Sequence, residues 1–77
     1  MNNKEIVNAK VEIILPTYAI ARFDYNEAEC VGSIHISQIT EEYVENINNW
    51  LEEGKVYPAT ILGYSEKHHK WLLTLRE

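Results

Sequence analysis

The stretch Val31-Gly32-Ser33-Ile34-His35-Ile36-Ser37 decides the fold of this 77-residue chain. Its two isoleucines alternate with Ser33, His35 and Ser37, which is the two-residue period of a strand with one apolar and one polar face. Thr40 follows shortly, and threonine is a residue type that caps the start of helices. The stretch therefore predicts a strand that leads into a helical segment, with His35 on the face opposite the isoleucines.

Two longer segments with the same period precede this stretch. Residues 6–15 are apolar at every odd position from 7 onward, which predicts a strand. The dipeptide Pro16-Thr17 interrupts the pattern, because proline has no N–H to give to a strand ladder. Residues 18–25 resume the alternation, with two alanines and two aromatic residues on the predicted inner face. The residues that this leaves on the outer face are Tyr18, Ile20 and Arg22.

The chain beyond residue 40 predicts one helical segment and two more strands. Apolar residues recur every three to four positions within residues 41–53, which is the spacing of an amphipathic helix of about three turns. Gly54 is a residue type that ends helices. Three asparagines inside the segment are poor helix formers, so the segment could instead form shorter turns. Residues 55–64 and 71–76 alternate again, and we predict that they form the fourth and fifth strands.

Five strands with a helical segment between the third and the fourth is the element order of a small Greek-key β-barrel of the OB class. A chain of this length holds one small core, so we expect a single all-β domain over residues 1–77 with its core at about residues 5–76. Trp50 and Trp71 both fall on the apolar positions of their elements. We predict that these two rings lie in the core and do not serve as binding platforms.

The charge of the chain argues against coating nucleic acid by bulk electrostatics. The net charge is −5, and five of the twelve acidic residues lie within residues 41–53. Lys67, Lys70 and Arg76 gather instead near the C-terminus, so one side of the molecule is expected to be acidic and another weakly basic. The acidic segment is expected to be a solvated face, with docking onto a basic partner such as a ribosomal protein as the alternative.

Several classes of site and location are not expected from this sequence. The N-terminus lacks the apolar stretch of a signal peptide and the longest apolar runs are a few residues, which predicts a cytoplasmic protein without a membrane partner. Adjacent side chains such as His68 and His69 diverge in an extended segment, and no cysteine or second histidine spacing completes a metal site beside them. No acid accompanies a serine and His35, so we expect neither a cofactor nor an enzyme.

Several short motifs follow one another along the chain at the spacing that is typical of one known family. They are Gly32-Ser33-Ile34-His35-Ile36-Ser37-Gln38-Ile39, then Tyr43-Val44 and Ile47, then Leu51 and Gly54, then Ile61-Leu62, and finally Leu73-Thr74-Leu75-Arg76. Together they resemble the ribosomal S1-type RNA-binding domain, which shows a G-L-V-H-I-S segment, an L-x-x-G turn and a closing L-S-L-K or L-S-I-R strand. The likeness spans essentially the whole chain. The spacing of Val44-Glu45-Asn46-Ile47 is most similar to small single-domain bacterial proteins of the general stress protein 13 type.

The resemblance also implies where RNA would bind. The F-G-A-F segment of the family falls on Thr17-Tyr18-Ala19-Ile20, so both stacking aromatics are absent and a tyrosine replaces the glycine. His35 matches the histidine of the family and Lys70 matches the basic residue of its last turn, while the usual aspartate falls on Ser65. The expected RNA-binding residues are Tyr18, Ile20, Arg22, His35, Lys67 and Lys70.

Two functions follow from this resemblance and its departures. The surviving histidine and terminal cations favour a module that binds single-stranded RNA weakly and without sequence specificity, in association with the ribosome or translation. The missing aromatics and the excess of acidic residues favour the alternative, a protein-interaction or regulatory OB domain that kept the barrel and lost its RNA face.

Overall fold

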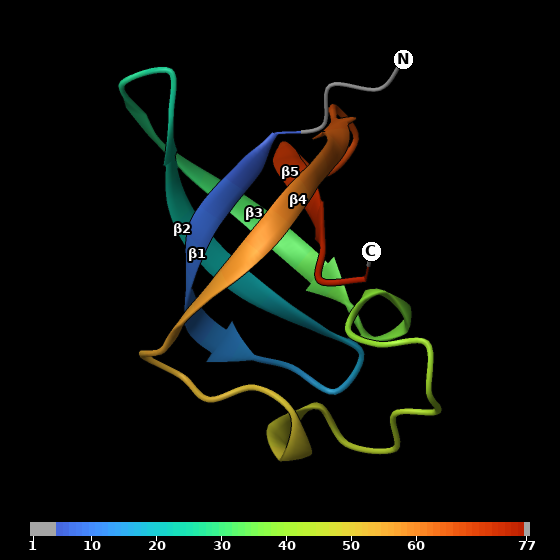
Figure 1. The fold of residues 1–77 in the computed structure, drawn as a ribbon. Coiled ribbons are helices and arrows are strands. Elements are labelled where there is room, and N and C mark those ends of the chain that lie inside the picture. The colour runs from blue at the N-terminus through green and yellow to red at the C-terminus, as the bar shows by residue number, and fades with distance from the viewer. Residues whose placement is uncertain (1–4, 77) are drawn as a thin grey trace.

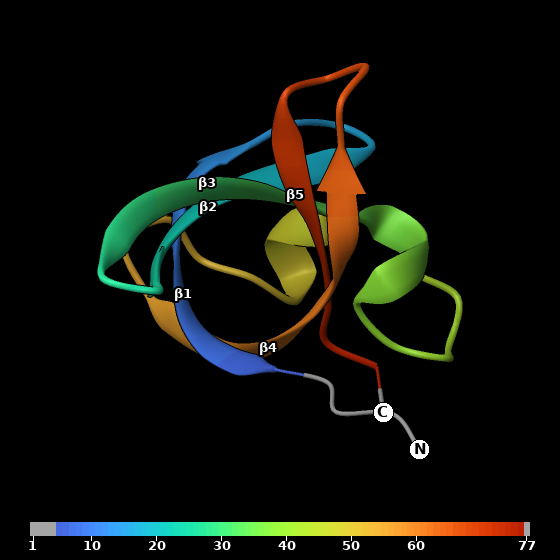
Figure 2. The same cartoon turned by 90° about the horizontal axis from the view of Figure 1, so that it is seen from above.

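Five strands close into a barrel in the computed structural model, which describes residues 5–76 (Figure 1). They are β1 (Ile6–Ile14), β2 (Tyr18–Tyr25), β3 (Ala28–His35), β4 (Val56–Ser65) and β5 (Lys70–Thr74). Their order around the barrel is β1-β2-β3-β5-β4, and β1 pairs with β4 to close the ring, which Figure 2 shows end-on. β3 and β5 run parallel, and the other neighbours are antiparallel. The expected OB-class barrel is confirmed.

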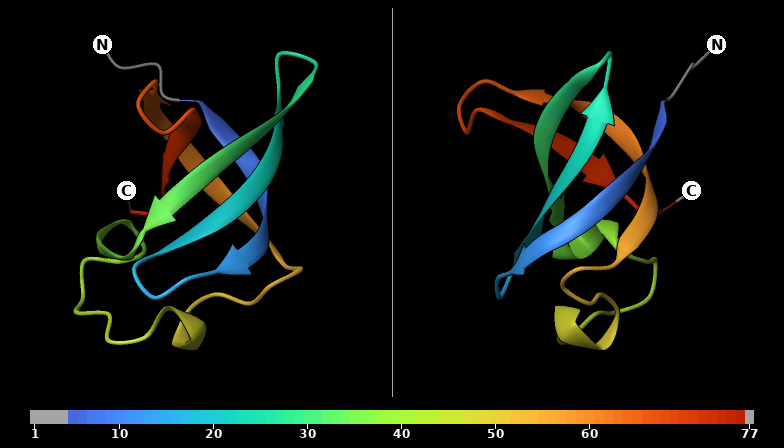
Figure 3. Two further views of the ribbon diagram at one scale, coloured as in Figure 1. Left: turned by 180° about the vertical axis from the view of Figure 1, so that it is seen from behind. Right: turned by 90° about the vertical axis from the view of Figure 1, so that its left-hand side faces the viewer.

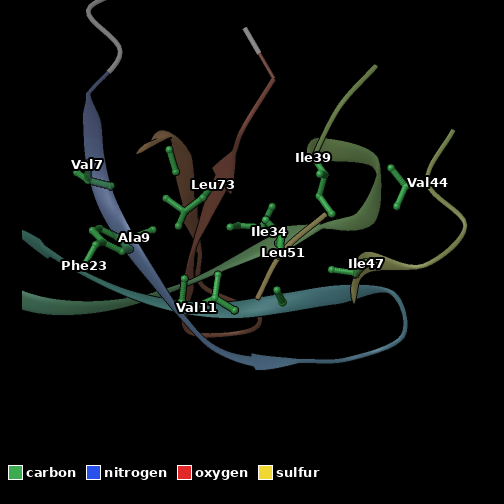
Figure 4. Close-up of a cluster of buried hydrophobic side chains, with 13 residues drawn as sticks. Val7, Ala9, Val11, Phe23, Ile34, Ile39, Val44, Ile47, Leu51 and Leu73 are labelled. Carbon is green, nitrogen blue, oxygen red and sulfur yellow. The ribbon is translucent and has the colours of Figure 1, made fainter. Parts of the chain in front are cut away.

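The inner wall of β3 is packed so closely that one position has no room for a side chain. A Cβ atom on Gly32 would lie 3.0 Å from Leu73 Cγ and 3.0 Å from Phe23 Cε1. Ile34, two residues further along the strand, is completely buried and pairs with Leu73 of β5. Figure 4 shows these side chains converging in the barrel interior with Val11 and other residues of β1. The glycine of the opening stretch is therefore required by packing.

Two β-bulges shift the alternation of inner and outer residues. The register between β1 and β2 slips between Val11 and Ile13, so Ile13, which the sequence placed inside, is 51% exposed. The register between β4 and β5 slips between Ile61 and Gly63, and the intervening Leu62 is exposed. A bulge adds one unpaired residue and bends its strand, which is how a short strand wraps a narrow barrel.

Three aromatic rings gather at the end of the barrel where the β4–β5 turn lies. The Trp71 ring meets Tyr64 edge-on, with 5.1 Å between ring centroids, and meets Tyr25 edge-on at 5.4 Å. Trp71 is partly buried and packs against the core, as the sequence predicted. Pro58 lies at an open edge, because Val56 to Ala59 of β4 pair with β1 alone.

The single helix predicted over residues 41–53 is not formed. The connection between β3 and β4 contains two short 3₁₀ turns, η1 (Ile36–Gln38) and η2 (Ile47–Asn49), as the alternative of shorter turns allowed. Thr40 does accept a hydrogen bond from the Glu42 N–H at 3.4 Å, but it caps no helix. No helical turn within residues 5–76 is long and apolar enough to cross a membrane.

This connection closes the barrel end opposite the β4–β5 turn (Figures 1 and 3). The side chains that it buries against the core are Ile39, Val44, Ile47 and Leu51. Two of its apolar residues do not take part. Tyr43 is 86% exposed and Trp50 is 42% exposed, so the predicted burial of Trp50 and of the apolar helix face at Tyr43 is wrong. A few buried side chains are enough to hold an irregular loop against the core, and the side chains between them remain exposed to solvent.

Candidate nucleic-acid interface

A groove of about 270 Å³ lies on the outer surface of β2, β3 and β5. The residues that line it are Tyr18, Ser33, His35, His68, Lys70 and Leu72, and we call it the Tyr18 groove. The strand register explains their meeting, because Tyr18 pairs with His35 across β2 and β3, and Ser33 pairs with Leu72 across β3 and β5. Figure 3 shows β2 and β3 side by side on this face. None of the six lining residues is acidic, although the protein carries a net charge of −5.

Tyr18 supplies the aromatic surface of the groove. Its ring is half-buried, and the ammonium group of Lys70 lies 5.5 Å from the ring centroid, which is the geometry of a cation–π contact. Two of the expected site residues are thus in contact although they are far apart in the sequence. Tyrosine stands where the S1-type family has a glycine, and its side chain lies within the groove.

His35 is held by the turn that follows β3. The backbone N–H of Ser37 donates a hydrogen bond to His35 Nδ1 at 3.1 Å, which caps η1. Because Nδ1 accepts this bond, the neutral ring carries its proton on Nε2. One ring nitrogen therefore serves the fold, and the other remains as a hydrogen-bond donor on an exposed side chain.

The contact between Ser37 and His35 belongs to this cap. Ser37 Oγ lies 2.8 Å from His35 Nδ1, on the ring nitrogen that also accepts the backbone bond. Within residues 5–76 no carboxylate hydrogen-bonds the opposite ring nitrogen, so the third group of a catalytic triad is not in place. Over the same range no cluster of three or more histidine, cysteine or acidic side chains forms a metal site.

The structure separates the other expected residues from the groove. Ile20 follows Tyr18 on the outer face of β2 and pairs with Ser33, so it lies beside the groove and not in its lining. Arg22 lies further along and faces two carboxylates, with Nη1 3.4 Å from Glu29 and Nε 3.9 Å from Glu12. Lys67 is exposed in the β4–β5 turn, also outside the lining.

Three lining residues were not expected from the sequence. Ser33 and Leu72 lie on the outer phases of β3 and β5, so strand alternation alone could have nominated them. His68 lies in the turn before β5, where its backbone N–H donates to Ser65 Oγ at 3.3 Å. Its neighbour His69 has a positive φ of 55° and does not line the groove. The backbone conformation of this turn decides which of the two histidines faces the groove. The sequence did not reveal that conformation.

Comparison with known proteins points to one fold. The sequence matches no family model, and it has no significant match among curated proteins. A chain of the a/eIF2alpha–aDim2p–rRNA complex from Pyrococcus horikoshii OT3 aligns with a TM-score of 0.80 and 28% identity, over 99% of this chain and 45% of that one. The intact alpha subunit of aIF2 from Pyrococcus abyssi aligns with a TM-score of 0.82 and 26% identity, over 100% of this chain and 29% of that one.

A third solved structure, GSP13 from Bacillus subtilis, has a TM-score of 0.79 and 24% identity, with 97% of this chain and 55% of that one covered. This chain therefore spans between 29% and 55% of the length of these proteins. The alignments include all or nearly all of the five-stranded barrel. The resemblance of this chain to the S1-type domain of the OB fold, expected from its motifs, is thereby confirmed.

Proposed function

We propose that this protein is a single-stranded RNA-binding module and that RNA binds in the Tyr18 groove. The observation that carries the proposal is the convergence of a tyrosine ring, an imidazole and an ammonium group on one groove without a carboxylate. Single-stranded RNA is bound by stacking of bases on aromatic rings, at about 1–3 kcal/mol per base, while cations follow the backbone. A similar chain was solved in a complex that contains rRNA, which supports an RNA partner.

The composition of the groove sets the expected strength of binding. It offers one aromatic ring and one permanent cation, so we expect weak affinity without base specificity. Ile20 adds apolar contact beside the ring, and Arg22 and Lys67 are retained as outer phosphate contacts. Each phosphate contact adds about 0.7 to the slope of log affinity against log salt for a single strand, so the salt dependence should be shallow.

The wider setting belongs to the same proposal. We place the protein in the cytoplasm and in association with translation, because the similar chains include the alpha subunit of aIF2. We assign it no catalytic role, because the contact of Ser37 with His35 is accounted for by the η1 cap. An RNA-binding module of this kind needs no cofactor.

Fluorescence anisotropy with a short oligouridylate tests the proposal. Replacing Lys70 by alanine should weaken binding and reduce the salt slope by about 0.7, because one phosphate contact is lost. Lys10→Ala is the matched control, since Lys10 is exposed on β1 outside the groove and the net charge changes equally. The proposal fails if RNA does not bind at low salt, or if Lys70→Ala and Lys10→Ala behave alike.

A second candidate function is supported by the connection between β3 and β4. We call residues 41–53 the acidic loop, and its carboxylates are Glu41, Glu42, Glu45, Glu52 and Glu53. Tyr43 and Trp50 are exposed within this loop, and aromatic rings in such positions are typical of protein interfaces. A basic protein partner, such as a ribosomal protein, fits this combination of charge and rings. Pull-down with and without nuclease separates the candidates, because a direct protein partner persists after RNA is removed.

A further inference from the structure

Thr74, the last residue of β5, is the one polar residue within residues 5–76 that is buried, with 6% of its surface exposed. A buried hydroxyl costs stability unless it is hydrogen-bonded, and valine would fill the same space without that requirement. Thr74 Oγ1 donates to the Gln38 carbonyl at 3.3 Å and accepts the Arg76 N–H at 3.0 Å. The hydroxyl therefore joins the end of β5 to the η1 turn.

Arg76 extends this link to the residue that contacts the groove histidine. Its Nη1 donates to the Ser37 carbonyl at 3.2 Å, and the Leu75 N–H beside it donates to the Gln38 carbonyl at 2.8 Å. The Ser37 N–H in turn donates to His35 Nδ1 at 3.1 Å. A series of hydrogen-bonded residues thus connects the buried hydroxyl at the end of β5 to the imidazole in the groove.

The η1 turn is held from two sides, and the ring of His35 is held with it. The Thr17 carbonyl, just before β2, accepts the Ile36 N–H at 2.8 Å, while the end of β5 holds the two residues that follow. With Nδ1 occupied as an acceptor, the neutral ring presents Nε2–H on an exposed side chain. A donor that is oriented in advance loses less conformational freedom when it binds. The end of β5 therefore orients a donor of the Tyr18 groove from outside the groove.

We propose that Thr74 is a positioning residue of the Tyr18 groove. Acting through Arg76 and η1, it orients the His35 ring so that Nε2–H meets a hydrogen-bond acceptor of the RNA. The proposal rests on the proposed function and deepens it, because it names a residue that controls a groove contact without touching the RNA. One net hydrogen bond corresponds to about twofold to tenfold in affinity, which is the upper limit of the effect of Thr74.

NMR spectra of the imidazole nitrogens test the positioning step in the absence of RNA. They are recorded at about pH 8, above the range in which free histidine titrates, and they show which ring nitrogen carries the proton. Wild-type His35 should be protonated at Nε2 alone, whereas Thr74→Val should give a mixture of the two ring tautomers. Thr74→Ser retains the hydroxyl and should restore the single tautomer. Thr60→Val is the matched control, because Thr60 pairs with Thr74 across β4 and β5 and no hydrogen bond links its side chain to η1.

The affinity for oligouridylate separates positioning from a loss of stability. Thr74→Val should weaken binding in the wild-type background, by no more than His35→Ala does. It should have no further effect in the His35→Asn background, because asparagine retains the cap but offers no imidazole to orient. A merely structural role would weaken binding equally in both backgrounds.

Arg76→Met provides a second variant in case Thr74→Val does not fold. Arg76 is exposed, and the substitution removes its donation to the Ser37 carbonyl without emptying a buried site. It should produce the same mixture of tautomers at His35. Lys10→Ala is its control, because it removes an equal charge outside the groove.

The contrary outcomes are distinguishable. A single His35 tautomer in both Thr74→Val and Arg76→Met, or an equal loss of affinity in the two backgrounds, overturns the positioning role and leaves RNA binding intact. A mixture of tautomers in Thr60→Val overturns the assignment to Thr74 as well. Wild-type protein that binds no RNA at low salt overturns the proposed function and this proposal together.

Discussion

The two faces of β3 differ in what surrounds them. On the inner face, Gly32 and Ile34 are enclosed by the core and have no free volume around them. On the outer face, Ser33 and His35 line a groove that no other part of residues 5–76 fills. Successive residues of one strand therefore serve the fold and the site in turn. Stability and RNA affinity should therefore respond to different substitutions in the same seven-residue stretch.

The largest effect is expected on the inner face. Ile34→Ala removes a completely buried side chain and should lower the free energy of unfolding by about 2–5 kcal/mol, because the transfer free energy is lost and a cavity remains. Urea denaturation followed by circular dichroism measures this change. If the alanine variant is unfolded, Ile34→Val should cost about 0.5–1.5 kcal/mol. Loss of RNA affinity in the folded valine variant would contradict the separate roles of the two faces.

The next effect is expected at the aromatic platform on the outer face. Tyr18→Ala should weaken oligouridylate binding by about 1–3 kcal/mol, because the stacking surface is removed. Tyr18→Phe retains the ring and serves as the matched variant, which should bind nearly as wild type. Anisotropy measures both affinities, and thermal unfolding confirms that the barrel is intact. Wild-type affinity in Tyr18→Ala would exclude the groove as the stacking site.

The smallest effect is expected at His35, which lies on the outer face and also caps the η1 turn. His35→Ala should lower the free energy of unfolding by about 0.5–1 kcal/mol, because the cap on the Ser37 N–H is lost. His35→Asn should keep most of that stability, because asparagine is a good capping residue. Both variants lose the imidazole and should bind RNA less tightly than wild type. Equal stability of the two variants would exclude the capping role.

Most of the barrel could be predicted because its strands alternate along most of their length. The inner and outer sets of β2 and β3 follow the two-residue period without interruption, and so Tyr18, Ile20 and His35 were placed on the correct face. The bulge in β1 was not predictable, because Ile13 and Ile14 are equally apolar and the pattern does not show which turns inward. The prediction of a helix over residues 41–53 was wrong because the apolar residues that produced its spacing include exposed side chains, such as Tyr43.

The site was only partly predictable, for related reasons. Alternation places Tyr18 and His35 on the outer face, and the strand register then brings them together with Lys70. Arg22 was expected among the contacts, but two carboxylates on neighbouring strands hold it, and cross-strand ion pairs depend on a register that the sequence did not specify. His68 was not expected in the groove, because its position is set by the backbone of a turn and not by a periodic pattern.

The central claim is that RNA occupies the Tyr18 groove, and an amide chemical-shift map tests it most directly. Isotope-labelled protein titrated with oligouridylate should show its largest shifts at the groove residues. These are Tyr18, Ser33, His35, His68, Lys70 and Leu72. Smaller shifts are expected at Ile20 and Lys67, and the acidic loop should remain unchanged. Shifts confined to the acidic loop, or no shifts at saturating RNA, would contradict the claim.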